Sequence, residues 1–77
     1  MKNTQIQNTL RFYRTQKGLT QWQVAAHLGF KSIDRICKWE KGRGFPHILN
    51  ALKLQELYDA SIKDFYFLEG QKKSINE

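Results

Sequence analysis

The apolar residues of the chain recur every three or four positions, and no stretch alternates apolar and polar residues as a half-buried strand does. This pattern predicts an all-α protein with five helices. The expected segments are 4–17, 20–28, 32–41, 46–58 and 61–66. Thr20, Ser32 and Ser61 are suitable N-cap residues, Pro46 suits the opening of a helix, and glycines follow the first two segments.

One side of each predicted helix carries the candidate core. The apolar positions expected to face inward are Ile6, Leu10, Tyr13, Val24, Ala25, Leu28, Ile36, Trp39, Ile48, Ala51, Leu52, Leu54, Tyr58, Ile62, Phe65 and Tyr66. A chain of 77 residues is one small domain, which buries about 60% of its unfolded surface. The polar stretch EGQKKSINE after Leu68 predicts a flexible tail. The expected division is therefore a domain at 1–68 and a tail at 69–77, with no room for a separate dimerisation or effector domain.

The second and third predicted helices are short, and Gly29, Phe30 and Lys31 alone separate them. Gly29 has no Cβ and takes a positive φ without steric cost, and Ala25 is small enough for a close helix crossing. Such a pair is typical of a helix-turn-helix, whose second helix enters the DNA major groove while the first crosses the backbone. Trp22, on the outer side of the first helix of the pair, either lies against the DNA backbone or packs across a neighbouring helix.

The chain has a net charge of +6 and a pI near 9.7, and its positive charge is unevenly placed. Residues 1–43 contain nine Lys and Arg against two Asp and Glu, whereas residues 44–77 contain four against five. A basic half of this kind favours a surface that binds a polyanion. The alternative is a basic surface that serves solubility.

Other chemistries lack candidate residues. A single Cys excludes an internal disulfide framework, and without a signal peptide or an apolar run of about 18 residues we expect a cytoplasmic protein with no membrane contact. His27 and His47 have no Cys, Asp or Glu at metal-ligand spacing, and no nucleophile–base pair or phosphate-binding glycine loop is evident. We therefore expect no enzyme activity, metal, cofactor or small-molecule ligand.

Between about residues 6 and 66 the chain carries an ordered set of features. They are Leu10, Arg14, Leu19-Thr20-Gln21, Ala25, Leu28-Gly29, Ile36, Trp39-Glu40, Gly42, Pro46 and Ser61-Ile62. This set resembles the phage repressor/Cro-type (Xre-like) helix-turn-helix family. The resemblance implies a compact five-helix repressor-like domain, with the helix-turn-helix formed by helices 2 and 3. It also implies a sequence-specific transcriptional regulator, a repressor, that binds double-stranded DNA.

The resemblance assigns contacts to the DNA backbone. Gln21 matches a position that contacts a phosphate. Lys41, Arg43 and the backbone of Gly44 match a loop that touches the sugar-phosphate chain. Lys31 is one residue more than the commonest turn contains, and we expect it to bind phosphate as well.

Other matches are structural. Ile36 and Trp39 match the buried positions of the recognition helix. Arg14 and Glu40 match a salt bridge that ties the first helix to the end of that helix. Asp59 stands where a glycine often ends the fourth helix, and Asp tolerates the left-handed conformation required there.

The recognition helix predicted at 32–41 has two unlike sides. At about 100° per residue, its inner side carries Ile36, Trp39 and Glu40. Its outer side carries Asp34, Cys37, Lys38 and Lys41, with Ile33 and Arg35 at the edges. The residues expected to face the bases are Ser32, Ile33, Asp34, Cys37 and Lys38.

Each of these base-facing residues has an alternative role. Lys38 donates to guanine O6 and N7, or to a phosphate. Asp34 accepts from cytosine N4, repels wrong sequences, or serves the helix through its dipole and an i, i+4 pair with Lys38. Ile33 contacts a thymine methyl or seals the seam with the second helix. Cys37 fits a close approach to bases, where its oxidation would add bulk, and Ser32 caps the helix or contacts a phosphate.

One such module covers few bases, so we expect a homodimer on a roughly palindromic operator with half-sites about one helical turn apart. Its contact would come from the fourth and fifth helices or from Phe67, Leu68 and the tail. The alternative function is a protein-interaction module of the same fold, antitoxin-like or an anti-repressor partner, which Asp34 and Ile33 favour. RNA is a weaker third candidate, because its A-form major groove is too deep and narrow for a helix.

Overall fold

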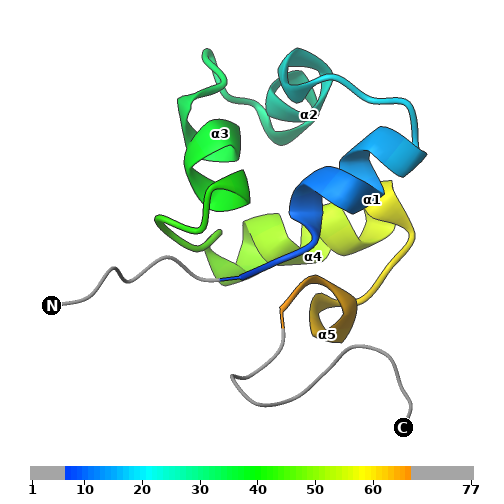
Figure 1. The fold of residues 1–77 in the computed structure, drawn as a ribbon. Helices are drawn as coiled ribbons and strands as arrows, with labels where there is room; N and C mark the ends of the chain where they lie inside the picture. Colours follow the sequence, from blue (N-terminus) through cyan, green and yellow to red (C-terminus); the bar gives the residue numbers. More distant parts are fainter. Residues whose placement is uncertain (1–6, 67–77) are drawn as a thin grey trace, which may run out of the picture.

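The computed structural model describes residues 7–66, which form five α-helices (Figure 1). They are α1 (Leu10–Gln16), α2 (Gln21–Leu28), α3 (Asp34–Glu40), α4 (Ile48–Tyr58) and α5 (Ile62–Phe65). The all-α class and the five-helix architecture predicted from the sequence are confirmed. The expected tail at 69–77 lies outside the described residues, as do Ile6, Phe67 and Leu68. None of the helices between residues 7 and 66 is long and apolar enough to cross a membrane.

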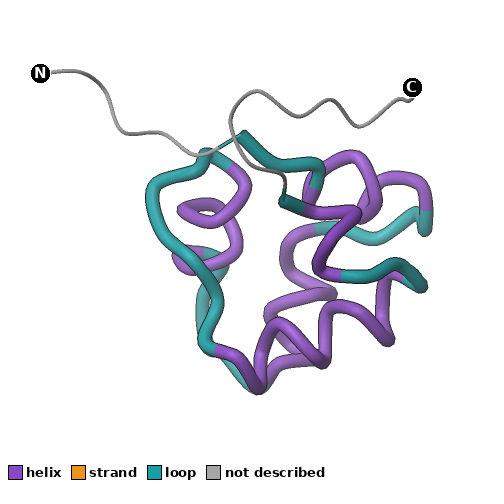
Figure 2. The backbone as a smooth tube through the Cα atoms, turned by 90° about the horizontal axis from the view of Figure 1, so that it is seen from below, coloured by secondary structure: helices purple, strands orange, loops and turns teal. Residues whose placement is uncertain are grey.

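One hydrophobic core joins all five helices. In Figure 1, α1 and α4 cross the middle of the molecule, with α2 and α3 on one side and α5 on the other. Figure 2 shows the same helices surrounding a common centre. The buried cluster there consists of Leu10, Val24, Ala25, Leu28, Ile36, Trp39, Leu54, Tyr58 and Phe65. The Phe65 ring contacts the rings of Tyr13 and Tyr58 edge to face, which fastens the short α5 to the rest of the core.

The first helix begins at Leu10, so the prediction of a helix from Thr4 is wrong for the residues before it that the structure describes. Asn8 Oδ1 accepts a hydrogen bond from the Leu10 N–H at 3.0 Å, and the Thr9 N–H donates to the Phe65 carbonyl at 3.0 Å. Asn8 also pairs with Tyr66 in a single antiparallel bridge. These local and tertiary hydrogen bonds replace the helical ones, as Asn side chains commonly do at helix starts.

Helix α2 begins and ends where the sequence predicts. The Thr20 side chain accepts from the Gln23 N–H, the Gln23 side chain accepts from the Thr20 N–H, and Gly29 adopts a φ of 83° at the other end. In contrast, α3 begins at Asp34 rather than at Ser32, and Ile33 occupies the cap position. The Ser32 hydroxyl accepts from the Asp34 N–H at 3.3 Å, so it forms a tight turn before the helix and is not its N-cap.

Helix α4 buries a narrower side than its apolar residues predict. Ala51, Leu54 and Tyr58 are buried as expected, whereas Ile48 and Leu52 are 58% and 45% exposed. The prediction that these two residues belong to the core is wrong. Apolar residues cover a wider arc of α4 than the neighbouring helices contact. The cap is also displaced: His47 Nδ1 accepts from the Leu49 N–H, so Pro46 precedes the cap instead of opening the helix.

Helix α5 has the predicted Ser61 cap. The Ser61 N–H and hydroxyl donate to Asp64 Oδ2 at 2.9 and 3.1 Å, and the Asp64 N–H donates to the Ser61 carbonyl at 2.9 Å. At the end of α4, Asp59 adopts the left-handed conformation with a φ of 57°. Asp59 is the one non-glycine residue with a positive φ between residues 7 and 66. Its side chain lies 3.7 Å from Lys17 Nζ in an exposed ion pair.

Candidate nucleic-acid interface

Helices α2 and α3 lie next to each other at one end of the molecule, joined by a five-residue turn (Figure 1). Gly29 reverses the chain through its left-handed conformation, after which the Phe30 N–H donates to the Ala25 carbonyl at 2.8 Å. Ala25 is fully buried, so its small side chain allows the turn and the following helix to approach. The turn thereby presents α3 as a separate element at the surface.

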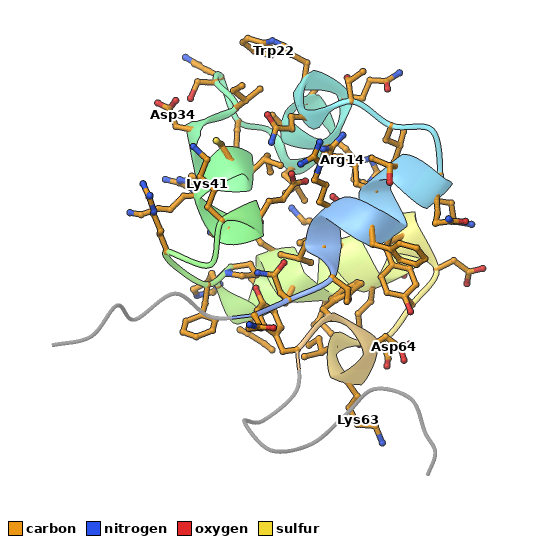
Figure 3. All side chains as sticks on the ribbon, in the orientation of Figure 1. Arg14, Trp22, Asp34, Lys41, Lys63 and Asp64 are labelled. Carbon is orange, nitrogen blue, oxygen red and sulfur yellow. The ribbon has the colours of Figure 1, made fainter. Side chains whose placement is uncertain are left out.

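A buried ion pair holds the end of α3 against α1. Arg14 Nε donates to Glu40 Oε2 at 2.5 Å and Arg14 Nη2 donates to Glu40 Oε1 at 3.2 Å, while Arg14 Nη1 donates to the Leu19 carbonyl. Figure 3 shows Arg14 pointing into the molecule between these helices. The two side chains are 10% and 6% exposed. The hydrogen bond to Glu40 raises the Arg14 pKa despite the opposing effect of burial, so the arginine stays charged.

Gln21 belongs to the same network. Its side-chain N–H donates to Glu40 Oε1 at 3.1 Å, so the first residue of α2 is tied to the last residue of α3. The amide group keeps one further N–H donor. Sequence reasoning assigned Gln21 to a phosphate but did not detect this second role.

The outer side of α3 is exposed, as Figure 3 shows for Asp34 and Lys41. Lys38 is exposed on the same helix and Cys37 is half-buried. Ile33 is also half-buried and packs against the hydrophobic core. This position agrees with a role in sealing the contact between the helices, and only part of the side chain is available to a base. The inner side is closed by Ile36 and Trp39, which are 2% and 5% exposed, and by the ion-paired Glu40.

Asp34 and Lys38 do not form the ion pair that their spacing suggests. The ion pairs within residues 7–66 are Arg14–Glu40 and Lys17–Asp59. Lys38 instead lies along the loop after α3, where a Cβ added to Gly44 would be 3.4 Å from Lys38 Cδ. The side chain therefore extends toward the C-terminal end of α3 while Asp34 occupies the N-terminal turn. The sequence pattern could not show this, because the Lys38 side chain extends toward Gly44, six residues further along the chain.

The residues assigned to phosphates lie at both ends of α3. Lys31 is exposed in the turn before the helix, and Lys41 and Arg43 are exposed in the loop after it. In that loop the Gly42 N–H donates to the Trp39 carbonyl and the Arg43 N–H donates to the Lys38 carbonyl. The Gly44 N–H makes no hydrogen bond within the described part of the chain, so it remains a donor at the surface.

Arg35 is a candidate that sequence reasoning left without a role. Its guanidinium carbon lies 4.6 Å from the centre of the Phe30 ring, and that ring contacts Trp39 edge to face. Arg35 is exposed and forms no ion pair with a carboxylate between residues 7 and 66. Stacking occupies the face of a guanidinium and leaves its edge N–H groups available. The sequence feature that could have indicated this stacking is an aromatic residue in the turn, five positions before an arginine.

Large apolar residues are also exposed outside α3: Phe12 on α1, Trp22 on α2 and a group at the start of α4. Trp22 is 60% exposed and points outward from α2 (Figure 3), so it does not pack across a neighbouring helix. The group at the start of α4 is called the α4 surface below. It consists of Phe45, Ile48, Leu49 and Leu52. Within residues 7–66, no three His, Cys, Asp or Glu side chains come together as a metal site.

No protein-family model matches the chain. The chain is similar to an uncharacterised HTH-type transcriptional regulator of Methanocaldococcus jannaschii, with 31% identity over 67 residues. The aligned residues cover 87% of this chain and the whole length of that protein. The similarity therefore includes the turn between α2 and α3 as well as the packing helices.

Proposed function

Because the chain belongs to the family of HTH-type transcriptional regulators, we propose that it is a repressor of the repressor/Cro (Xre-like) type that binds double-stranded DNA sequence-specifically. In this proposal residues 1–68 form the DNA-binding domain, the protein acts in the cytoplasm and α3 lies in the major groove. The observation that carries the proposal is the construction of α3. Ile36, Trp39 and the Arg14–Glu40 pair fix its inner side, while its outer side presents cations to solvent.

The proposed base contacts divide along α3. Asp34, in the first turn, accepts from cytosine N4, and Lys38 donates to guanine O6 and N7 nearer the other end. Because the two side chains do not neutralise each other, both are available to DNA. Ser32 and Cys37 contribute smaller contacts to the same surface, and Ile33 contributes an apolar edge beside a thymine methyl.

The proposed phosphate contacts flank these base contacts. Lys31 and Arg35 act on the side of the turn, and Lys41, Arg43 and the Gly44 N–H act on the side of the loop. In the proposed complex, cations would lie on both walls of the DNA major groove that contains α3. Such contacts favour one orientation of the helix on the duplex.

Gln21 adds a contact from the start of α2. Its hydrogen bond to Glu40 fixes the direction of the amide, so the remaining N–H donor is oriented before DNA binds. The same bond links the phosphate contact to the position of α3. We therefore assign Gln21 both a structural and a phosphate-binding role.

A single α3 reads few base pairs, so the regulator is proposed to act as a homodimer. Two copies related by a two-fold axis would bind a roughly palindromic operator with half-sites about one helical turn apart. No small-molecule effector or cofactor is part of the proposal.

In-vitro selection from random duplex DNA tests the proposal. A selected sequence with two inverted half-sites is expected, and its affinity should fall with salt by a log–log slope of about −0.9 for each phosphate neutralised. Failure to enrich any sequence, or an affinity independent of ionic strength, would exclude the DNA-binding role.

The alternative of a protein-interaction module rests on Asp34, an exposed carboxylate with no ion-pair partner in the described residues. On such a module Asp34 would pair with a basic side chain of another protein. The same selection distinguishes the two functions, because a module that binds protein alone would enrich no operator. For such a module, Asp34→Asn should also enrich no operator. In the DNA-binding proposal, Asp34→Asn changes the preferred base at one position.

A further inference from the structure

Trp22 is a large aromatic residue that stands exposed beside the proposed DNA-binding surface. It is the second residue of α2 and is 60% exposed, and Figure 3 shows it pointing away from the core. Its indole N–H has no hydrogen-bond partner within residues 7–66. The residues one turn further along α2, Ala25 and Ala26, are too small to cover the ring. Trp22 therefore offers a partner both apolar area and a hydrogen-bond donor.

The start of α2 is fixed relative to α3. The Thr20–Gln23 capping box forms its first turn, and the Gln21 side chain donates to Glu40 at the end of α3. At about 100° per residue, Trp22 lies about 60° around the helix axis from Ala25, the fully buried residue beside the turn to α3. Trp22 therefore lies on the α3 side of α2, at the edge that faces solvent.

The charge near Trp22 favours an anionic partner. Helix α2 contains no acidic residue, so no carboxylate of its own offsets the positive end of the helix dipole at its start. Between residues 7 and 43 the carboxylates are those of Asp34, in the first turn of α3, and Glu40, which is paired with Arg14. A phosphate beside Trp22 would therefore meet a helix start without negative charge.

We infer that Trp22 lies against the sugar-phosphate backbone at the edge of the major groove. Its ring packs on a deoxyribose, and its indole N–H donates to a phosphate oxygen. The contact continues the one proposed for Gln21, the preceding residue. A ring on a sugar carries no sequence information, so Trp22 positions the protein on the duplex and does not read bases. The inference rests on the proposed function, because it adds a residue to the same DNA complex.

The contribution of Trp22 should differ from that of the cations in its dependence on salt. A lysine or arginine on a phosphate releases counterions, so its removal makes the salt slope smaller. Trp22 has no charge, and its contribution comes from apolar burial and one hydrogen bond. Its removal should therefore weaken binding to all sequences alike and leave both the salt slope and the preferred bases unchanged.

Titrations of operator and scrambled duplexes at several salt concentrations test this signature. Trp22→Ala should weaken binding to both duplexes by roughly tenfold. Trp22→Phe keeps a ring but loses the N–H donor, so it should weaken binding by roughly threefold. Phe12→Ala, at a 54% exposed aromatic residue of α1, is the matched control and should bind as the wild type does. Urea unfolding of each variant checks that the fold is retained.

Acrylamide quenching of tryptophan fluorescence detects the contact directly. Trp39 is 5% exposed, so Trp22 provides the accessible emission, and Trp22→Phe measures Trp39 alone. Operator DNA should reduce the quenching of the wild type nearly to that of Trp22→Phe. Equal quenching of Trp22 with and without bound DNA, wild-type affinity in Trp22→Ala, or a changed base preference in that variant would overturn the inference. A wild-type protein that binds no duplex would instead refute the proposed DNA-binding function.

Discussion

Helices α3 and α4 each turn one side to the same core, but their opposite sides have different chemistry. The outer side of α3 presents Asp34, Lys38 and Lys41, whereas that of α4 presents Ile48, Leu49 and Leu52. The inner sides are alike, because both bury large apolar residues. The difference between the helices therefore lies in what each leaves exposed: charge suited to a polyanion on α3 and apolar area suited to a protein on α4.

The two helices are also fixed by different forces. Helix α4 is held by the buried Ala51, Leu54 and Tyr58, while the seven-residue α3 ends in a buried carboxylate that pairs with α1. Because breaking a buried ion pair leaves an uncompensated charge, the position of α3 depends on one interaction far more than that of α4 does.

The largest expected effect comes from removing one partner of that pair. Glu40→Leu leaves Arg14 charged and buried, and should lower the free energy of unfolding by about 3–5 kcal/mol in urea titrations. The double variant with Arg14→Met should recover most of the loss, because neither charge then remains buried.

Lys17→Ala is the matched control for Glu40→Leu, since it breaks an ion pair whose side chains are 43% and 86% exposed. It should cost no more than about 1 kcal/mol. Equal losses in the Glu40 and Lys17 variants would mean that the ion pair does not anchor α3.

The next effect concerns the side of α3 that is proposed to read bases. Lys38→Ala should reduce affinity for the selected operator by about 1–3 kcal/mol and relax the preference at one base pair. Arg43→Ala should weaken all sequences alike and make the salt slope smaller by about one phosphate. Titrations of both variants against operator and scrambled duplexes distinguish these outcomes, and an unchanged preference in Lys38→Ala would remove that residue from base reading.

A smaller effect comes from Tyr66, whose ring contacts Phe45 of the α4 surface with their centres 5.6 Å apart. The Tyr66 hydroxyl is buried and has no hydrogen-bond partner in the described residues, so Tyr66→Phe should raise the free energy of unfolding by about 1 kcal/mol at neutral pH. Burial also raises the pKa of Tyr66 from 10.0 to about 12. The folded protein therefore keeps the phenol proton to higher pH than the unfolded chain.

The resulting stability is fully present below pH 10 and is lost as the pH rises toward about 12. Tyr66→Phe should make urea unfolding less dependent on pH across that range, while Tyr58, whose pKa is also raised by burial, retains its own dependence. The same pH dependence in the variant and the wild type would show that the folded state does not perturb Tyr66.

The elements predicted best from the sequence are those fixed by local chemistry. Helix α2 begins at the Thr20–Gln23 capping box and ends at Gly29 because side-chain hydrogen bonds and a missing Cβ act within a few residues. The inner side of α3 followed from helical spacing for the same reason: Ile36 and Trp39 are three residues apart and meet the same core.

The elements predicted worst depend on distant partners. Helix α1 starts late because the backbone before Leu10 pairs with the end of α5, more than fifty residues away. Ile48 and Leu52 have the spacing of core residues, but spacing does not tell whether another helix lies opposite. In the candidate site, the direction of the Lys38 side chain toward Gly44 could not be predicted because it depends on the path of a loop.

The smallest expected effect tests whether the charged surface of α3 extends to its edge. Arg35→Ala should weaken binding to all duplexes and make the salt slope smaller by about one phosphate. Arg35→Lys keeps the charge but loses the planar group stacked on Phe30, so it should preserve the slope and reduce affinity by about 0.5–1 kcal/mol.

A double-mutant cycle with Phe30→Leu measures the coupling between the two residues, because the stack is absent in each single variant. If the two substitutions change the free energy of DNA binding additively, the Phe30 ring does not orient the Arg35 guanidinium. The turn side of α3 is then an ordinary solvent-exposed helix edge. Coupling of the expected size would instead mean that an apolar ring in the turn orients a cation of the proposed DNA-binding surface of α3.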